Sequence, residues 1–176
     1  MSGEQTDEHM EKYKGTAKVA VNELKVLPDQ VIKALEDHKQ LYLSDPEQAH
    51  YWDPAVIGVP GGPVSCLLLE YTGRKSGKPL SMAIQYYRLD GHVAIVASKG
   101  GIEDQPLWYL NLLEKPECVV HIGSEVFDAS ARVATPDERA RWWPVIEEEQ
   151  PMQKIYQERT SREIPVVVLD PVGAAS

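Results

Sequence analysis

Short apolar runs separated by turn residues make up most of the chain from residue 64 onward. The runs are rich in Val, Ile, Leu and Tyr, and the Asp90-Gly91 pair between two of them is typical of a tight β-hairpin. This pattern predicts strands at Val64–Tyr71, Leu80–Leu89, Val93–Ala97, Glu117–Ile122, Val126–Ala134 and Ile164–Leu169.

Apolar residues at helical spacing precede and interrupt these runs. An amphipathic helix is predicted from Pro28 to about Leu43, followed by a short helical turn between Asp45 and Trp52. Later helices are predicted at Asp104–Leu113 with Asp104 as its cap, at Pro136–Glu149 with Thr135 and Glu138 as a capping box, and around Lys154–Arg159. Helices inserted among mostly antiparallel strands favour an α+β fold with a barrel-like sheet over a doubly wound parallel one.

The polar N-terminus sets the expected domain boundaries. Residues 1–18 carry almost no apolar periodicity and are predicted to be a frayed tail. Residues 19–176 are expected to form a single domain, with its core at 64–171 and a helical extension before it. No apolar run approaches the roughly 18 residues that span a bilayer. We therefore predict no integral membrane segment and a cytoplasmic location.

Composition excludes several classes of partner. The chain has a net charge of −9 and a pI near 5.0, which argues against a nucleic-acid partner because phosphate binding needs many basic contacts. Cys66 and Cys118 both lie in apolar runs, where a cysteine is expected to be a small buried hydrophobe. The histidines form no close pair at metal-ligand spacing. We predict no metal site.

Two glycine-punctuated basic turns stand out against this acidic background. The first turn is Thr72–Pro79 and the second turn is Ala97–Gly101, and together they hold four of the chain's 18 Lys and Arg. Glycines let backbone N–H groups approach an anion, while Lys and Arg add charge-assisted donors. The two turns therefore predict an anion-binding cradle, with solvated hairpin turns as the alternative. A nucleotide P-loop is rejected, because Pro79 stands where Ser or Thr must coordinate magnesium.

Six short motifs occur in a specific order along about residues 64–171. They are Thr72-Gly73-Arg74-Lys75-Ser76-Gly77, Asp90-Gly91, Ala97-Ser98-Lys99-Gly100-Gly101, Pro106 to Leu112, Glu138-Arg139 with Trp143, and Tyr156-Gln157 followed by Thr160, Arg162 and Ile164-Pro165-Val166. In this order they resemble the deazaflavin-dependent nitroreductase family. The resemblance implies a split β-barrel like that of FMN-binding oxidoreductases. It also implies the cofactor F420, with FMN less favoured, and hydride transfer to a small acceptor such as a quinone, enone or nitro compound.

The same resemblance implies a set of site residues. Those expected to bind the cofactor are Arg74, Lys75, Ser76, Gly77, Lys78, Ala97, Ser98, Lys99, Gly100, Trp108 and Asn111. Gln150, Gln153 and Tyr156 are expected to line the substrate pocket, with Tyr156 as the catalytic hydrogen-bond donor. The chain departs from the family pattern at four positions, where Gln150, Gln153 and Gln85 replace tyrosines and Leu80 replaces an arginine.

A second function class remains open. The same barrel could serve a non-catalytic protein that binds F420, a fatty acid or another lipid. The two cationic turns favour the cofactor, because a fatty-acid pocket has little need for them. The expected partner is a small-molecule acceptor, and the protein is expected to be a monomer or a homodimer.

Overall fold

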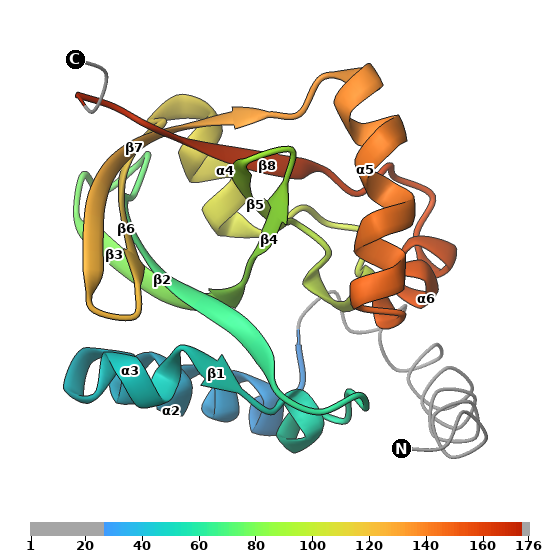
Figure 1. Cartoon of the computed structure of the whole chain (residues 1–176), viewed down its shortest axis with the longest axis horizontal. Helices are drawn as coiled ribbons and strands as arrows, with labels where there is room; N and C mark the ends of the chain where they lie inside the picture. Colours follow the sequence, from blue (N-terminus) through green and yellow to red (C-terminus); the bar gives the residue numbers. More distant parts are fainter. Residues whose placement is uncertain (1–26, 174–176) are drawn as a thin grey trace.

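The computed structural model describes residues 27–173, so the predicted tail at residues 1–18 lies outside the described part of the chain. Within it, eight strands form one antiparallel sheet that curls into a half-barrel (Figure 1). The strands are β1 (Tyr51–Trp52), β2 (Val64–Thr72), β3 (Pro79–Gln85), β4 (Tyr87–Leu89), β5 (His92–Val96), β6 (Glu117–Ile122), β7 (Glu125–Val133) and β8 (Val166–Pro171). Their order is β1-β2-β6-β7-β8-β5-β4, and β3 also pairs with β2.

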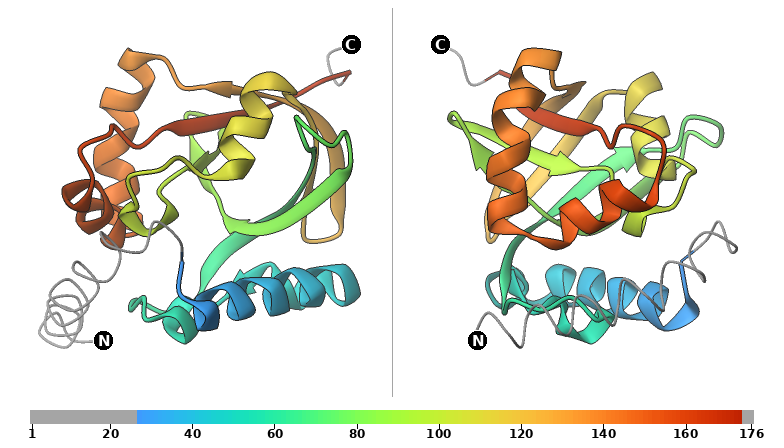
Figure 2. Two further views of the ribbon diagram at one scale, coloured as in Figure 1. Left: turned by 180° about the vertical axis from the view of Figure 1, so that it is seen from behind. Right: turned by 90° about the vertical axis from the view of Figure 1, so that its right-hand side faces the viewer.

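The helices pack on the outer faces of the curled sheet and against its inner core. They are α2 (Asp29–Ser44), α3 (Pro46–Ala49), α4 (Leu107–Glu114), α5 (Pro136–Glu149) and α6 (Met152–Arg159), with 3-10 turns η1 (Pro54–Ile57) and η2 (Lys99–Gly101). Figure 2 shows α2 running beneath the curl of strands, with α5 and α6 along one edge of the curl. None of the described helices is both long and apolar enough to cross a bilayer.

Strand β2 is buried on both faces, which explains its continuous apolar sequence. Leu67 and Leu69 point into the core inside the curl, where they meet Val120 and Ile95. Leu68 faces the other way and joins a small cluster with residues of α2, α3 and β3, namely Tyr42, Ala49 and Ala83. The fully buried run in the middle of β2 therefore holds two layers together.

The predicted strand Leu80–Leu89 is wrong in one respect, because the structure divides it into β3 and β4. Strand β3 pairs with β2, whereas β4 pairs with β5 on another side of the curl. Tyr86 lies at the corner and donates its backbone N–H to Ser65. The last strand begins two residues later than predicted, since the N–H of Ile164 donates to the Gln157 side chain and Pro165 has no N–H to offer.

Local signals at chain turns and helix ends are otherwise reliable. Asp90 and Gly91 both have positive φ, at +51° and +81°, as the predicted tight hairpin requires. The Thr135–Glu138 capping box is confirmed. The predicted cap at Asp104 is wrong, because α4 begins at Leu107 with Pro106 before it, and a proline disfavours helical backbone in the residue that precedes it.

Residues of two family-like motifs tie α5, α6 and β8 together. The Arg139 guanidinium donates to the Ile164 carbonyl and to the Gln157 side chain, both at 3.0 Å, and lies 4.3 Å from the centre of the Trp143 ring. Gln157 in turn donates to the carbonyl of Arg162 at 2.7 Å. These contacts fix the segment that follows α6, which packs against the second turn.

Candidate functional site

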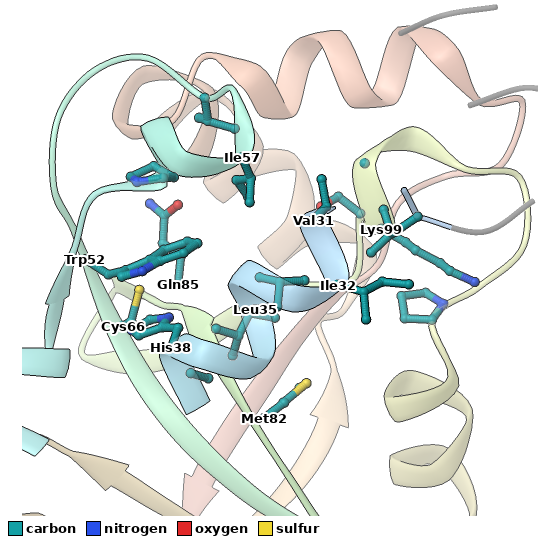
Figure 3. A pocket seen from close by; sticks show the side chains of 18 of the residues that line it. Val31, Ile32, Leu35, His38, Trp52, Ile57, Cys66, Met82, Gln85 and Lys99 are labelled. Carbon is teal, nitrogen blue, oxygen red and sulfur yellow. The ribbon is translucent and has the colours of Figure 1, made fainter. Parts of the chain in front are cut away.

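A cavity of about 1010 Å³ lies between α2 and the curled sheet (Figure 3). Its lining comes from α2, η1, β2, β3, the second turn, the start of α4 and the helices α5 and α6. This volume is at the upper end of the range for small-molecule sites. The cavity is therefore the candidate functional site.

Helix α2 forms one apolar wall of the cavity. Figure 3 shows Val31, Ile32 and Leu35 on this helix, between Lys99 on one side and His38 with Trp52 on the other. These three side chains are only half-buried or exposed, because they face the cavity and solvent rather than a packed core. The sequence predicts the helix and its apolar face, but apolar spacing alone does not say what that face covers.

The C-terminal half of α2 is anchored by buried polar contacts. The Tyr42 hydroxyl accepts a hydrogen bond from the Gly123 N–H at 2.8 Å, and lies 3.0 Å from the Cys66 carbonyl and 3.1 Å from the His121 carbonyl. One helical turn earlier, His38 is also buried. The wall is thus held firmly at one end.

His38 and Cys66, which line the cavity beside Trp52, are both uncharged. The His38 ring stacks on Trp52 with 4.4 Å between centroids, and its Nε2 donates to the Ala49 carbonyl at 2.9 Å. Burial lowers the pKa of His38, so the imidazole is neutral at pH 7. Burial raises the pKa of the nearby Cys66 thiol to about 12, so the thiol stays protonated and is a poor nucleophile.

Three glutamines gather at another part of the lining. Gln150 at the end of α5 donates to Gln85 of β3 at 3.3 Å, and Gln153 of α6 donates to the buried Tyr87 hydroxyl at 3.3 Å. Gln153 is 7% exposed, and its Oε1 has no hydrogen-bond partner in the described part of the chain. A buried acceptor without a partner costs free energy in the empty protein, so it is available to pair with a ligand.

Tyr156 lies one helical turn beyond Gln153 and also lines the cavity. Thus three of the four departures from the family pattern, at Gln85, Gln150 and Gln153, share one cavity with the predicted donor Tyr156. The sequence marks Gln85 only as a departure from the family pattern. It does not single out Tyr87, the hydrogen-bond partner of Gln153, because Tyr87 lies in an apolar run like many core residues.

The second turn presents backbone amides to the same cavity. Ser98 is right-handed (φ −78°, ψ −37°), and Lys99, Gly100 and Gly101 follow with φ of +46°, +64° and +81°. A right-handed residue followed by a left-handed one directs successive N–H groups into a concave anion site. Within residues 27–173 no acceptor is assigned to the N–H groups of Ser98, Lys99 or Gly100, and all three residues line the cavity. Lys99 accepts a left-handed conformation that costs an L-residue about 1–2 kcal/mol.

The first turn lies outside the cavity lining, at the tip of the β2–β3 hairpin. Asn111 of α4 accepts from both the Arg74 backbone N–H (3.1 Å) and the Arg74 Nη1 (3.0 Å), which fixes the turn to the helix. The Ser76 hydroxyl accepts from the backbone N–H of Lys78 at 3.1 Å, so its position serves the turn. Lys75, Gly77 and Lys78 are exposed.

Helix α4 connects the cavity with the first turn. Trp108 lines the cavity, while Asn111 on the next turn of the same helix face holds Arg74. Tyr71, one residue before the first turn, also lines the cavity. The cavity therefore gathers Gln85, Ser98, Lys99, Gly100, Trp108, Gln150, Gln153 and Tyr156, and its lining does not include Arg74, Lys75, Ser76, Gly77, Lys78, Ala97 or Asn111.

The lining offers little acid–base or metal chemistry of its own. Glu36 is its single carboxylate among the described residues, and it accepts from Gln40 and pairs with Lys39, both at 3.0 Å, which lowers its pKa. Across residues 27–173 no group of three or more His, Cys, Asp or Glu side chains could hold a metal ion. The arrangement suits an anionic ligand at the second turn beside an uncharged acceptor at the glutamines, with the chemistry supplied by a bound cofactor.

Known proteins resemble this chain in sequence and in fold. The family model of F420H(2)-dependent quinone reductase matches residues 53–171. A Mycobacterium tuberculosis protein named F420H(2)-dependent quinone reductase is 40% identical over 114 residues, which covers 63% of this chain and 76% of the relative.

Two solved structures are also similar. One, titled F420-H2 dependent reductase, is 37% identical with a TM-score of 0.55, covering 60% of this chain and 93% of that one. Another, titled domain-swapped dimer, is 31% identical with a TM-score of 0.58, covering 77% of this chain and 95% of that one. The predicted α+β split β-barrel with inserted helices is confirmed.

Proposed function

The chain belongs to the F420H(2)-dependent quinone reductase family, and from that premise we propose that it reduces a small activated acceptor, a quinone above all, with a hydride from reduced F420. One observation carries the proposal at the level of residues. A single cavity is lined both by the anion-accepting second turn and by an uncharged group of three glutamines and Tyr156. The reaction needs both parts, one for the anionic cofactor and one for the neutral acceptor.

The residues present fit F420, whose phosphodiester and polyglutamate tail make it strongly anionic. The amides of Ser98, Lys99 and Gly100, together with the Lys99 ammonium, suit a phosphate oxygen. Trp108 offers an aromatic wall for the ring system. When bound, the reduced cofactor supplies the hydride, and the protein supplies position and electrostatics.

The first turn is proposed to bind the tail rather than the phosphate. It lies next to the cavity across α4, and Lys75 and Lys78 are exposed there. Arg74 is already held by Asn111 and lies 4.0 Å from Glu114, so part of its charge is offset. Contacts from this turn to the tail carboxylates are therefore solvent-screened and weaker than those at Lys99.

The glutamine end is proposed to orient the acceptor. A glutamine amide can donate to a carbonyl oxygen but cannot act as an acid near neutral pH. Quinone reduction takes up a proton as well as a hydride, and the Tyr156 hydroxyl or a water that it orients is the proposed source. Helix α2 and Trp52 give this space apolar walls, and polar contacts to the acceptor are stronger where such walls limit the access of water.

A fluorescence titration with F420, run beside FMN, tests the proposal. We expect micromolar or tighter binding of F420 alone, and oxidation of reduced F420 when a soluble benzoquinone is added. Lys99→Ala should weaken F420 binding. Lys154→Ala is its matched control, because Lys154 is exposed on α6 outside the cavity lining. F420 binding no tighter than FMN binding, or a lipid that copurifies with the protein and occupies the cavity, would contradict the proposal.

A further inference from the structure

Arg162 lies outside the cavity lining yet makes a dense set of contacts with the second turn. It follows α6 in the segment that leads to β8. Its guanidinium donates to three backbone carbonyls, of Ala97 at 3.1 Å, Ser98 at 2.9 Å and Ile102 at 3.0 Å. A fourth hydrogen bond reaches the Gln105 side chain at 2.9 Å. One side chain therefore spans the whole turn.

These hydrogen bonds engage the carbonyls of the turn with a side chain that lies outside the cavity lining. Arg159 adds a further donor to the Gly100 carbonyl at 3.1 Å. Gly101 packs closely against α6, since a Cβ at this position would lie 2.7 Å from the Tyr156 carbonyl oxygen. With its carbonyls occupied by arginines, the turn keeps its unassigned N–H groups at Ser98, Lys99 and Gly100 for the cavity.

We propose that Arg162 is a positioning residue that keeps the second turn in its anion-accepting conformation, and thereby sets the affinity for the phosphoryl group of the cofactor without touching it. This rests on the proposed function. A direct role as an anion ligand does not fit, because its Nε, Nη1 and Nη2 all donate to the turn or to Gln105. The planar fork is essential to this geometry, since a lysine ammonium cannot reach three separate carbonyls at once.

The proposal predicts a selective defect in the Arg162→Lys protein. The probes are F420 and the deazaflavin nucleoside analogue that ends at its ribityl hydroxyl and so lacks the phosphodiester and the tail. F420 affinity should fall by about tenfold or more, as expected when a preorganised anion site loses its shape. Affinity for the tail-less deazaflavin should change by less than about twofold, because its ring contacts lie elsewhere in the cavity.

Arg141→Lys is the matched control. Like Arg162, Arg141 uses its guanidinium to bond another residue, Asp90, at 3.2 Å. It is exposed in the first half of α5 and is not part of the cavity lining. Its substitution should leave both affinities unchanged. Thermal unfolding of each variant without ligand establishes that it is folded. If Arg162→Lys does not fold, Arg159→Met, which removes the hydrogen bond from Arg159 to the Gly100 carbonyl, should show a smaller defect with the same selectivity.

Four outcomes are decisive. A selective loss of F420 affinity supports the proposal, whereas a parallel loss of both ligands would mean that Arg162 supports the pocket as a whole and would overturn it. Unchanged affinity for both ligands would overturn it as well. A wild-type protein that does not bind F420 would instead refute the proposed function, so the two failures are distinguishable.

Discussion

Replacing Lys99 with glycine should weaken cofactor binding, and the resulting protein should be more stable than the one in which Lys99 is replaced with alanine. Lys99 has a φ of +46°, a left-handed conformation that costs a residue with a Cβ about 1–2 kcal/mol. Glycine adopts it without that cost, but gains about 0.5–1 kcal/mol of extra entropy in the unfolded chain. Relative to Lys99→Ala, which keeps a Cβ, the glycine variant should therefore be more stable by about 0.5–1 kcal/mol.

Both variants lose the same ammonium from the cavity. One charge-assisted hydrogen bond contributes about 1.5–3 kcal/mol, so the Kd for F420 should rise about 10- to 150-fold in each. The expected gain in stability corresponds to a melting temperature about 1–4 °C higher for Lys99→Gly than for Lys99→Ala at this chain length. Stability and function at this residue are thus expected to oppose each other.

The assay combines two measurements on the wild type and the two variants. Thermal unfolding is followed by circular dichroism without cofactor, and F420 binding is followed by fluorescence. A glycine variant less stable than the alanine variant would refute the strain at Lys99. An unchanged Kd for F420 in both variants would show that the Lys99 side chain does not contact the cofactor, whether or not its backbone is strained.

Three further substitutions test other parts of the structure. Lys75→Ala should raise the Kd for F420 by less than about fivefold at low salt and have no effect at high salt, because the side chain is exposed; a loss equal to that of Lys99→Ala would contradict the placement of the first turn. Gln153→Tyr should change kcat/KM among quinones by about tenfold while the Kd for F420 stays within about twofold, as measured by steady-state kinetics beside the titration, and a parallel change in both would place Gln153 at the cofactor. The Arg132 guanidinium holds the pKa of Glu138 at about 2, below its ordinary 4.5, so its carboxylate stabilises the fold above pH 4.5 and progressively less as the pH falls toward 2. Glu138→Gln should therefore cost about 1–2 kcal/mol of unfolding free energy at pH 7 after allowance for solvent screening, and urea titrations that find the same deficit at pH 3 would refute this.

Local sequence signals located most of the helices and strands. The capping box at Thr135, the Asp90-Gly91 turn and the apolar run of β2 each depend on neighbouring residues, so they can be read directly. The split between β3 and β4 could not be, because it depends on which distant strand each half pairs with.

The candidate site was also only partly predictable from the sequence. The second turn and Gln150, Gln153 and Tyr156 were named from the motifs, and the structure brings them into one cavity. The motifs also grouped the first turn with them, whereas the hairpin places that turn outside the lining. Arg162 was visible as part of a motif, but its role depends on the path of the chain after α6 and could not be inferred from spacing.

Helix α2 precedes residue 53, where the match to the family begins, and yet it forms a wall of the cavity. The stretch that the family shares therefore holds the proposed cofactor and acceptor residues, while a stretch outside it forms part of the cavity that they line. Variation in residues 27–49 is expected to change the shape of the cavity both beside the second turn, where Leu27 lies next to Gly100, and near Trp52. A chimaera that exchanges only this helix between relatives would therefore measure how far a wall outside the shared stretch sets both ligand affinities.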